Sequence, residues 1–192
     1  MKISIEDLRN GDLILMHNWS IMGWTIWTLT GSWWNHIAIY KDGFVIEARK
    51  GVVKNSIDIY LNNPKFDIGV FRVKESAFAS KEEYEQAIIT ATNYAEAQVG
   101  KPYDKMAIIW IGILKLSRGF LRKIIPKRYN PWQSRFRFFC SELICECWWI
   151  TSSLVKNLFA GKKYPKAKCG TCVPKDIAKS VHSEWVTGTN KI

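Results

Sequence analysis

The chain has 192 residues, of which 47% are hydrophobic and 14% aromatic, and it carries a formal net charge of +11. This apolar content excludes an intrinsically disordered chain, and the length suits one compact domain over residues 1–192. The longest apolar run, Met106–Leu116, is too short to cross a bilayer, which takes about 20 residues. The first residues lack the basic and apolar regions of a signal peptide. We therefore expect a cytoplasmic protein, with peripheral contact at a membrane as an alternative, and reduced cysteines rather than disulfides.

The basic residues cluster in two stretches. From Lys105 to Ser141 there are nine Lys or Arg and no acidic residue, and a second basic stretch runs from Lys156 to Lys168. A basic face attracts phosphates, anionic lipid or acidic polymers. It is equally compatible with a solvated surface that binds nothing. Because no nucleic-acid motif accompanies the charge, no specific nucleic-acid partner is expected.

The first half of the chain predicts an antiparallel sheet. A short helical turn and the Asn10-Gly11 turn come first. Two β-prone runs then flank Asp42-Gly43, a strong signal for a two-residue hairpin. The runs that predict strands are Leu13–Met16, 35–40, 44–49, 51–60 and 67–73.

The second half predicts helices. Ser80 is a candidate N-cap for a helix that runs to Gly100, and Pro174 is placed to begin a short last helix. Residues 106–116 and 139–155 are further helical candidates, the second one buried. Strands followed by helices indicate an α+β protein.

His36 and Glu47 are expected to lie on one face of the hairpin. With a two-residue turn, Tyr40 faces Val45, and alternation along the strands makes His36 and Glu47 diagonal neighbours at about 7–8 Å. A carboxylate that accepts from one imidazole nitrogen leaves the other nitrogen to take a proton. The alternative is a solvent-facing Glu47 beside an ordinary strand histidine. Two such residues on one face favour the functional interpretation.

The five cysteines have different predicted roles. Cys140 falls where a helix begins, and the partial positive charge and N–H groups there favour a thiolate and can stabilise an oxyanion. Cys145 and Cys147 are interpreted as packing residues. Together with the C-x-x-C pair, Cys169 and Cys172, they could supply four thiolates to zinc. Because Cys145 and Cys147 point in different directions from one helix, no metal or other cofactor is expected, and a redox role for the C-x-x-C pair is a weaker alternative.

Six short motifs in this order carry a family resemblance. They are GDLIL, SWWNHIAIY, VIEA, GKPYD, FFCSELIC and CVPKDIAKS. They resemble the permuted papain-like cysteine peptidases and amidases of the YiiX group, in the NlpC-type superfamily, with lecithin:retinol acyltransferase as a more distant relative. The resemblance extends from Gly11 to about Ser180. It implies a circularly permuted papain-like α+β fold, an antiparallel sheet or small barrel packed against helices, with a basic insertion or cap at about residues 113–137.

The resemblance also implies site residues. Cys140 is similar to the nucleophile, His36 to the general base and Glu47 to the group that orients it. Asp12 is interpreted as a turn or capping residue. The residues expected to contact the substrate are Tyr103, Asn35, Trp34 and Ser141.

The expected function is thiol hydrolysis through an acyl-enzyme, on an amide bond of a peptide or peptidoglycan fragment. A lipid acyl hydrolase or acyltransferase at a membrane surface is the alternative, because ten tryptophans and many basic residues suit a lipid interface. A non-catalytic binder of membrane or nucleic acid would explain the charge, but not the order of His, Glu and Cys. A zinc-stabilised structural module is the remaining alternative.

Overall fold

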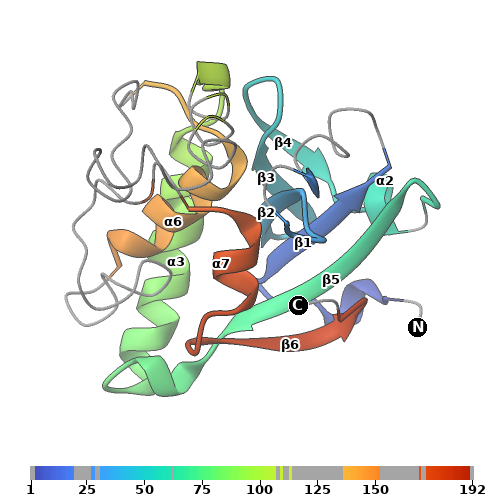
Figure 1. Cartoon of the computed structure of the whole chain (residues 1–192). Coiled ribbons are helices and arrows are strands. Elements are labelled where there is room, and N and C mark those ends of the chain that lie inside the picture. Colours follow the sequence, from blue (N-terminus) through green and yellow to red (C-terminus); the bar gives the residue numbers. More distant parts are fainter. Residues whose placement is uncertain are drawn as a thin grey trace.

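The computed structural model describes residues 3–19, 27–28, 31–61, 63–106, 109, 113, 136–151, 169 and 172–190. Figure 1 shows helices α3, α6 and α7 on one side of a curved sheet, with the short α2 near its other end. The strands are β1 (Leu13–Asn18), β2 (His36–Lys41), β3 (Phe44–Ala48), β4 (Val52–Ser56), β5 (Phe66–Val73) and β6 (Ser183–Gly188). The helices are η1 (Ile5–Asp7), α2 (Asp58–Leu61), η2 (Glu75–Ala77), α3 (Lys81–Ala97), α6 (Cys140–Trp149) and α7 (Pro174–Ala178).

The described strands form one six-stranded sheet in the order β4-β3-β2-β1-β5-β6. Every neighbouring pair is antiparallel. The structure thus confirms an α+β protein with an antiparallel sheet packed against helices.

The predicted hairpin register is confirmed. Tyr40 pairs with Val45 and Lys41 with Phe44. Asp42 and Gly43 both have positive φ, 49° and 82°, as a type I′ turn requires. A two-residue turn of this kind fixes which side chains of β2 and β3 share a face.

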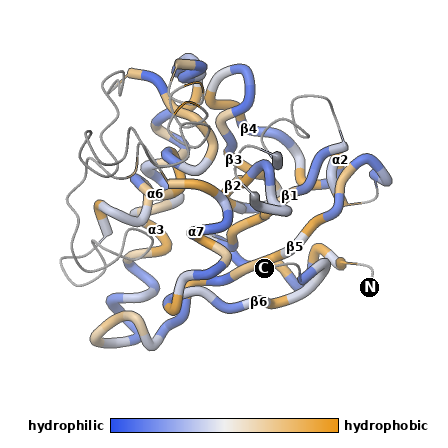
Figure 2. The backbone as a smooth tube through the Cα atoms, viewed as in Figure 1, coloured by the Kyte–Doolittle hydropathy of each residue, from blue (hydrophilic) through white to orange (hydrophobic). Residues whose placement is uncertain are grey.

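Apolar side chains cover both faces of the sheet. Leu13 and Leu15 of β1 belong to a cluster shared with α3 and α6. The alternate residues Ile14 and Met16 belong to a second cluster, which includes Tyr60 of α2. Figure 2 shows hydrophobic residues along the strands and on parts of the helices, and hydrophilic residues at several of the outer turns.

The helix starts follow local sequence signals. The Ser80 side chain accepts a hydrogen bond from the Glu83 amide at 3.2 Å, as predicted for the N-cap of α3. Pro174 begins α7, also as predicted. Phe139 precedes α6 without a side-chain cap, and α6 is buried from Cys140 to Trp148.

Several predictions need correction. The run 51–60 is not one strand, because β4 ends at Ser56 and the chain turns into α2. Strand β6, which pairs with β5 at the edge of the sheet, was not predicted. The helix predicted from Ser80 to Gly100 ends at Ala97.

Part of the basic and apolar sequence lies outside the described residues. This holds for the second basic stretch, for most of the insertion or cap expected at residues 113–137, and for most of Met106–Leu116. Met106, Ile109 and Ile113 are described; they are helical and exposed. In the described part of the chain, no helix combines the length and apolar character needed to cross a bilayer.

Candidate active site

His36 and Glu47 meet across the hairpin, as the sequence predicted. Strand alternation places them on the face that also carries Ala38, Tyr40 and Val45. The His36 Nε2 atom forms a hydrogen bond with Glu47 Oε2. The His36 side chain is 16% exposed, whereas that of Glu47 is fully buried.

Two further side chains hold the Glu47 carboxylate. Asn55 Nδ2 donates to Glu47 Oε1 at 2.8 Å, and the Tyr60 hydroxyl donates to the same oxygen. Burial favours the neutral acid, but the hydrogen bonds and the charge of His36, with the bonds from Tyr60 and Asn55, outweigh it and lower the pKa of Glu47 to about 2. The carboxylate is therefore ionised at neutral pH and fixed at both oxygens.

Cys140 is the first residue of α6, a helix that packs against β2 and β3. The residue is 5% exposed. Burial opposes the charged form of His36, but hydrogen bonding and charge from Cys140 and Glu47 outweigh it and raise the pKa of His36 to about 10. His36 thus lies between Cys140 and the Glu47 carboxylate, and its interactions with both residues favour the imidazolium.

Tyr103 lies beside the thiol. It forms an isolated bridge with Phe138 and packs against Phe139 and Val173. Burial raises the pKa of the Tyr103 hydroxyl, and the charges of Cys140 and Asp104 raise it further. Its hydroxyl consequently stays protonated and available as a donor near Cys140.

The other three residues expected to contact the substrate are buried and form contacts within the protein. Trp34 is 1% exposed and packs edge-on against Phe71. Buried Asn35 accepts from the Asn18 amide and donates to the Asn18 carbonyl, both at 3.0 Å. These contacts anchor the entry to β2, so Trp34 and Asn35 support His36 from the interior.

Ser141 has a similar internal contact. Its buried hydroxyl donates to the Cys172 carbonyl at 2.7 Å. The bond joins the first turn of α6 to the segment that precedes α7. Ser141 therefore positions the start of α6, and its side chain is directed at protein rather than at solvent.

An aromatic cluster surrounds His17 at the end of β1. The His17 ring stacks on Trp33 with centroids 4.1 Å apart, and Trp19 and Trp27 meet it edge-on. Trp19 is 62% exposed. Trp19 is thus exposed near this end of the sheet, where Met16 of β1 pairs with His36.

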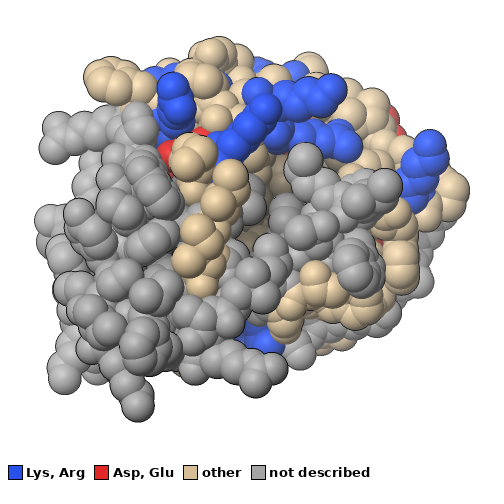
Figure 3. Space-filling model, turned by 45° about the horizontal axis from the view of Figure 1, so that its top comes forward, with Lys and Arg blue, Asp and Glu red and all other residues tan. Residues whose placement is uncertain are grey.

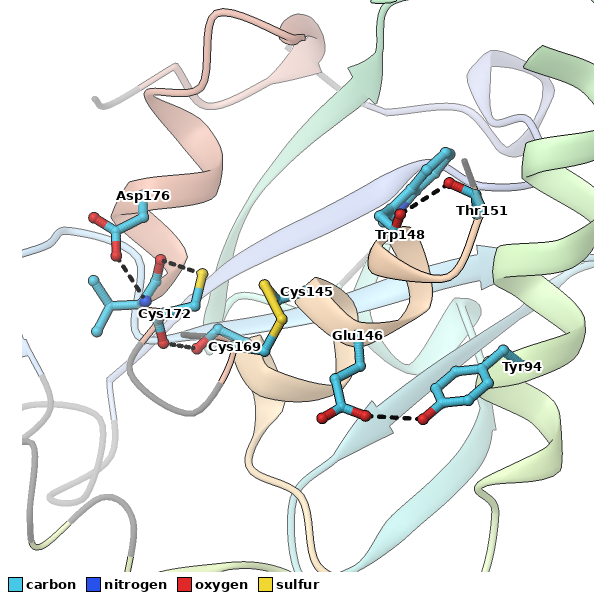
Figure 4. Close-up of a disulfide and its surroundings, with 10 residues drawn as sticks. Tyr94, Cys145, Glu146, Trp148, Thr151, Cys169, Cys172 and Asp176 are labelled. Atoms are coloured by element: carbon cyan, nitrogen blue, oxygen red, sulfur yellow. Dashed lines mark hydrogen bonds between the residues drawn. A yellow bond between two sulfur atoms is a disulfide. The ribbon is translucent and has the colours of Figure 1, made fainter. Parts of the chain in front are cut away.

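Cys145 and Cys169 form a disulfide, which corrects the expectation of reduced cysteines (Figure 4). Their Cα atoms lie 5.2 Å apart. Cys140, Cys147 and Cys172 are buried thiols. The disulfide ties α6 to the segment before α7 and occupies two of the four sulfurs that the zinc alternative requires.

Asp12 lies in the turn before β1, which agrees with its interpretation as a turn or capping residue, and it also binds Arg72 of β5. Its buried carboxylate accepts from Arg72 Nε and Nη2, both at 2.7 Å, and from the Arg9 amide at 2.8 Å. These bonds link the start of β1 to β5, and the Asp12 carbonyl accepts from the Tyr40 amide of the hairpin at 2.8 Å.

Tyr60 and Asn55 are the site residues that sequence reasoning missed. Asn55 carries a weak signal, since it pairs with Val45 and is a polar residue in a β-prone run. Tyr60 carries none, because its contact depends on the turn from β4 into α2.

The fold and the site together define an α+β protein in which a cysteine at a helix start faces a histidine and a buried glutamate on an antiparallel sheet. No model of a known protein family matches the sequence, and no curated protein matches it significantly. Five chains of solved structures match. One is the metalloprotein YiiX from Escherichia coli O157:H7, which is 18% identical, with a TM-score of 0.59 over 95% of this chain and 98% of YiiX. This likeness confirms a YiiX-like fold.

Proposed function

We propose that this protein is a cysteine-dependent hydrolase of the permuted papain-like type, which cleaves an amide bond through an acyl-enzyme. The proposal rests on one observation: His36 of β2 interacts with both Cys140 of α6 and Glu47 of β3. A thiol, an imidazole and a carboxylate in this order are the components of thiol acyl transfer.

The first step is proton transfer from Cys140 to His36. Glu47 binds His36 Nε2, which leaves Nδ1 for exchange with the thiol. The pKa of His36, raised to about 10, favours the imidazolium at neutral pH. The resulting thiolate is the nucleophile.

The thiolate then attacks the carbonyl carbon, and the carbonyl π electrons move to oxygen. The first N–H groups of a helix have no partner within it, so those at the start of α6 can donate to this oxyanion. The Tyr103 hydroxyl, held protonated by burial and by the charges near it, is a further donor beside the thiol.

In the last steps His36 returns the proton to the leaving amine, and the C–N bond breaks to give a thioester on Cys140. His36 next takes a proton from water, which attacks the thioester. The carboxylic acid leaves, and the thiol is restored. Glu47 stays ionised throughout and stabilises the imidazolium.

The solved neighbour is described as a metalloprotein. In the described residues of this chain, no group of three or more His, Cys, Asp or Glu is arranged to hold a metal ion.

The proposed substrate is an amide in a peptide or peptidoglycan fragment, and a lipid acyl ester is the alternative. Exposed Trp19 is the observation that favours the alternative, since tryptophan suits a lipid interface. Co-sedimentation with anionic vesicles at low salt separates them. Retention on the vesicles supports the lipid substrate, and its absence supports the amide.

The test is acylation of the protein by an activated acyl ester, followed by intact mass and peptide mapping. We expect one acyl group on Cys140, and loss of acylation and turnover in Cys140→Ala. Cys147→Ala is the matched control, because Cys147 is a buried thiol on the same helix whose pKa is raised by burial. Turnover that survives in Cys140→Ala, or an acyl group mapped to another residue, would contradict the proposal.

A further inference from the structure

Three chain segments lie side by side around the candidate site. Gly51 forms an antiparallel bridge with Pro102, and the Val52 amide donates to the Lys101 carbonyl at 2.8 Å. Tyr103 forms a parallel bridge with Phe138. The segments 49–51, 101–105 and 136–140 therefore adjoin. The first begins two residues after Glu47, the second contains Tyr103, and the third ends at Cys140.

These segments are rich in positive charge. We name their cations the cationic collar: Arg49, Lys50, Lys101, Lys105 and Arg137. The same segments contain one acid, Asp104, which is 1% exposed. Figure 3 shows Lys and Arg side chains gathered along one side of a hollow in this face of the molecule.

The collar differs from the lysines on the neighbouring surface. Lys41 and Lys54 both form ion pairs with Glu96. Within the described residues, the collar cations form no ion pair with a carboxylate; Lys101 instead donates to Gln98 Oε1, at 2.5 Å, and lies over the Phe138 ring. A set of cations without carboxylate partners leaves a local positive potential along these three segments, the last of which ends at Cys140.

We propose that the cationic collar binds an anionic group, a carboxylate or a phosphate, on the acyl substrate of Cys140. The proposal rests on the proposed function for the role of Cys140 and adds the substrate class. The collar attracts the anion and holds the adjoining carbonyl near the thiol. Solvent separates these charges, so the attraction depends on ionic strength.

The test compares alkylation of Cys140 by iodoacetate and iodoacetamide, read by peptide mapping. The two reagents share the same displacement of iodide and differ by one negative charge. The iodoacetate to iodoacetamide rate ratio therefore reports the local potential and requires no turnover. Lys50→Gln, Lys105→Gln and Arg137→Gln, singly and together, leave Cys140, His36 and Glu47 in place.

At low salt we expect each substitution to lower the rate ratio roughly twofold, as for unit charges about 8 Å apart in water, and the triple variant to lower it about eightfold. At about 1 M salt, where charges are screened beyond roughly 3 Å, wild type and variants should converge. The control is Lys81→Gln, a 68% exposed lysine at the opposite end of α3 from Lys101. A helix of 17 residues is about 25 Å long, so this charge should not change the ratio.

An unchanged rate ratio in the triple variant, or an equal decrease in Lys81→Gln, would contradict anion binding by the cationic collar. Neither outcome would affect the acylation test with Cys140→Ala. Inorganic phosphate and acetate, each compared with chloride at equal ionic strength, then identify the anionic group by the greater protection of Cys140. Protection by neither anion would contradict a binding role.

Discussion

Two fully buried carboxylates occupy the same sheet and are paired in different ways. Asp12, just before β1, is bound by Arg72 of β5. Glu47 of β3 is bound by His36 of β2, with Asn55 and Tyr60 as additional donors. Both pairs avoid the free-energy penalty of a lone buried charge.

The difference lies in the cation. Arginine keeps its proton at any ordinary pH, and its bond with Asp12 raises the pKa of Arg72 further. His36 can release its proton and also interacts with Cys140. The Asp12 pair is therefore a clamp between strands whose cation does not titrate, whereas the Glu47 pair is suited to proton transfer.

The largest predicted effect is on turnover, in Glu47→Gln. The amide keeps the shape but not the charge that stabilises the His36 imidazolium. We expect turnover of an acyl substrate to fall by about 10²–10⁴-fold. Steady-state kinetics checks this, and the circular dichroism spectrum should match wild type. A fall in turnover of less than tenfold would show that Glu47 does not take part in the proposed proton transfer.

The next effect is on stability, in Asp12→Ala. The substitution leaves Arg72 without its carboxylate, and breaking a buried ion pair costs about 3–5 kcal/mol. Urea denaturation measures the free energy of unfolding. Glu85→Gln is the control, because its pair with Lys81 is exposed and such pairs contribute about 0–1 kcal/mol. Equal destabilisation by both substitutions would contradict the clamp.

The two carboxylates should also respond oppositely to acid. The pKa of Glu47 falls from 4.5 to about 2 on folding, so its stabilisation is complete above pH 4.5 and is lost as the pH falls toward 2. This corresponds to roughly 3 kcal/mol. Burial raises the pKa of Asp12, so protonation of that group favours the folded state.

His36 is protonated in both states over this range, because its pKa is above 6 whether it is folded or unfolded. Urea denaturation between pH 2 and 5 should therefore show a smaller acid-induced loss of stability in Glu47→Gln than in wild type. Identical pH dependence in the two proteins would contradict the assigned pKa of Glu47.

The smallest effect is expected for Tyr60→Phe, which removes one hydrogen bond to Glu47. A hydrogen bond to a charged group contributes about 1.5–3 kcal/mol, and turnover should fall because the carboxylate is less firmly held. Tyr40→Phe is the matched control, since the Tyr40 hydroxyl accepts from the Gly43 amide at 3.0 Å in the same cluster. Only Tyr60→Phe should change the pKa of His36, as measured by NMR.

The sequence predicts the parts of this molecule that depend on local rules. Asp42-Gly43 fixes the hairpin, and the hairpin register brings His36 to Glu47 without any knowledge of the tertiary structure. The start of α6 at Cys140 was likewise predictable from the pattern that precedes it.

The remaining contacts join residues whose spacing carries no local signal. Arg72 is 60 residues from Asp12, and the partner of Cys145 is 24 residues away. Tyr60 contacts Glu47 because strand β4 ends at Ser56 and the chain then turns into helix α2. The β-prone sequence of residues 51–60 does not predict this turn. Trp34, Asn35 and Ser141 lie within recognisable motifs, but only tertiary packing shows that they are buried.

The most direct test of the central claim is an NMR titration of the His36 imidazole. The chain has three histidines, so His36→Gln assigns the signal. If Cys140, His36 and Glu47 act as one unit, His36 should titrate near pH 10 in wild type and at lower pH in both Cys140→Ala and Glu47→Gln. Titration near the ordinary value of 6.5 in all three proteins would contradict the unit and the hydrolase proposed from it.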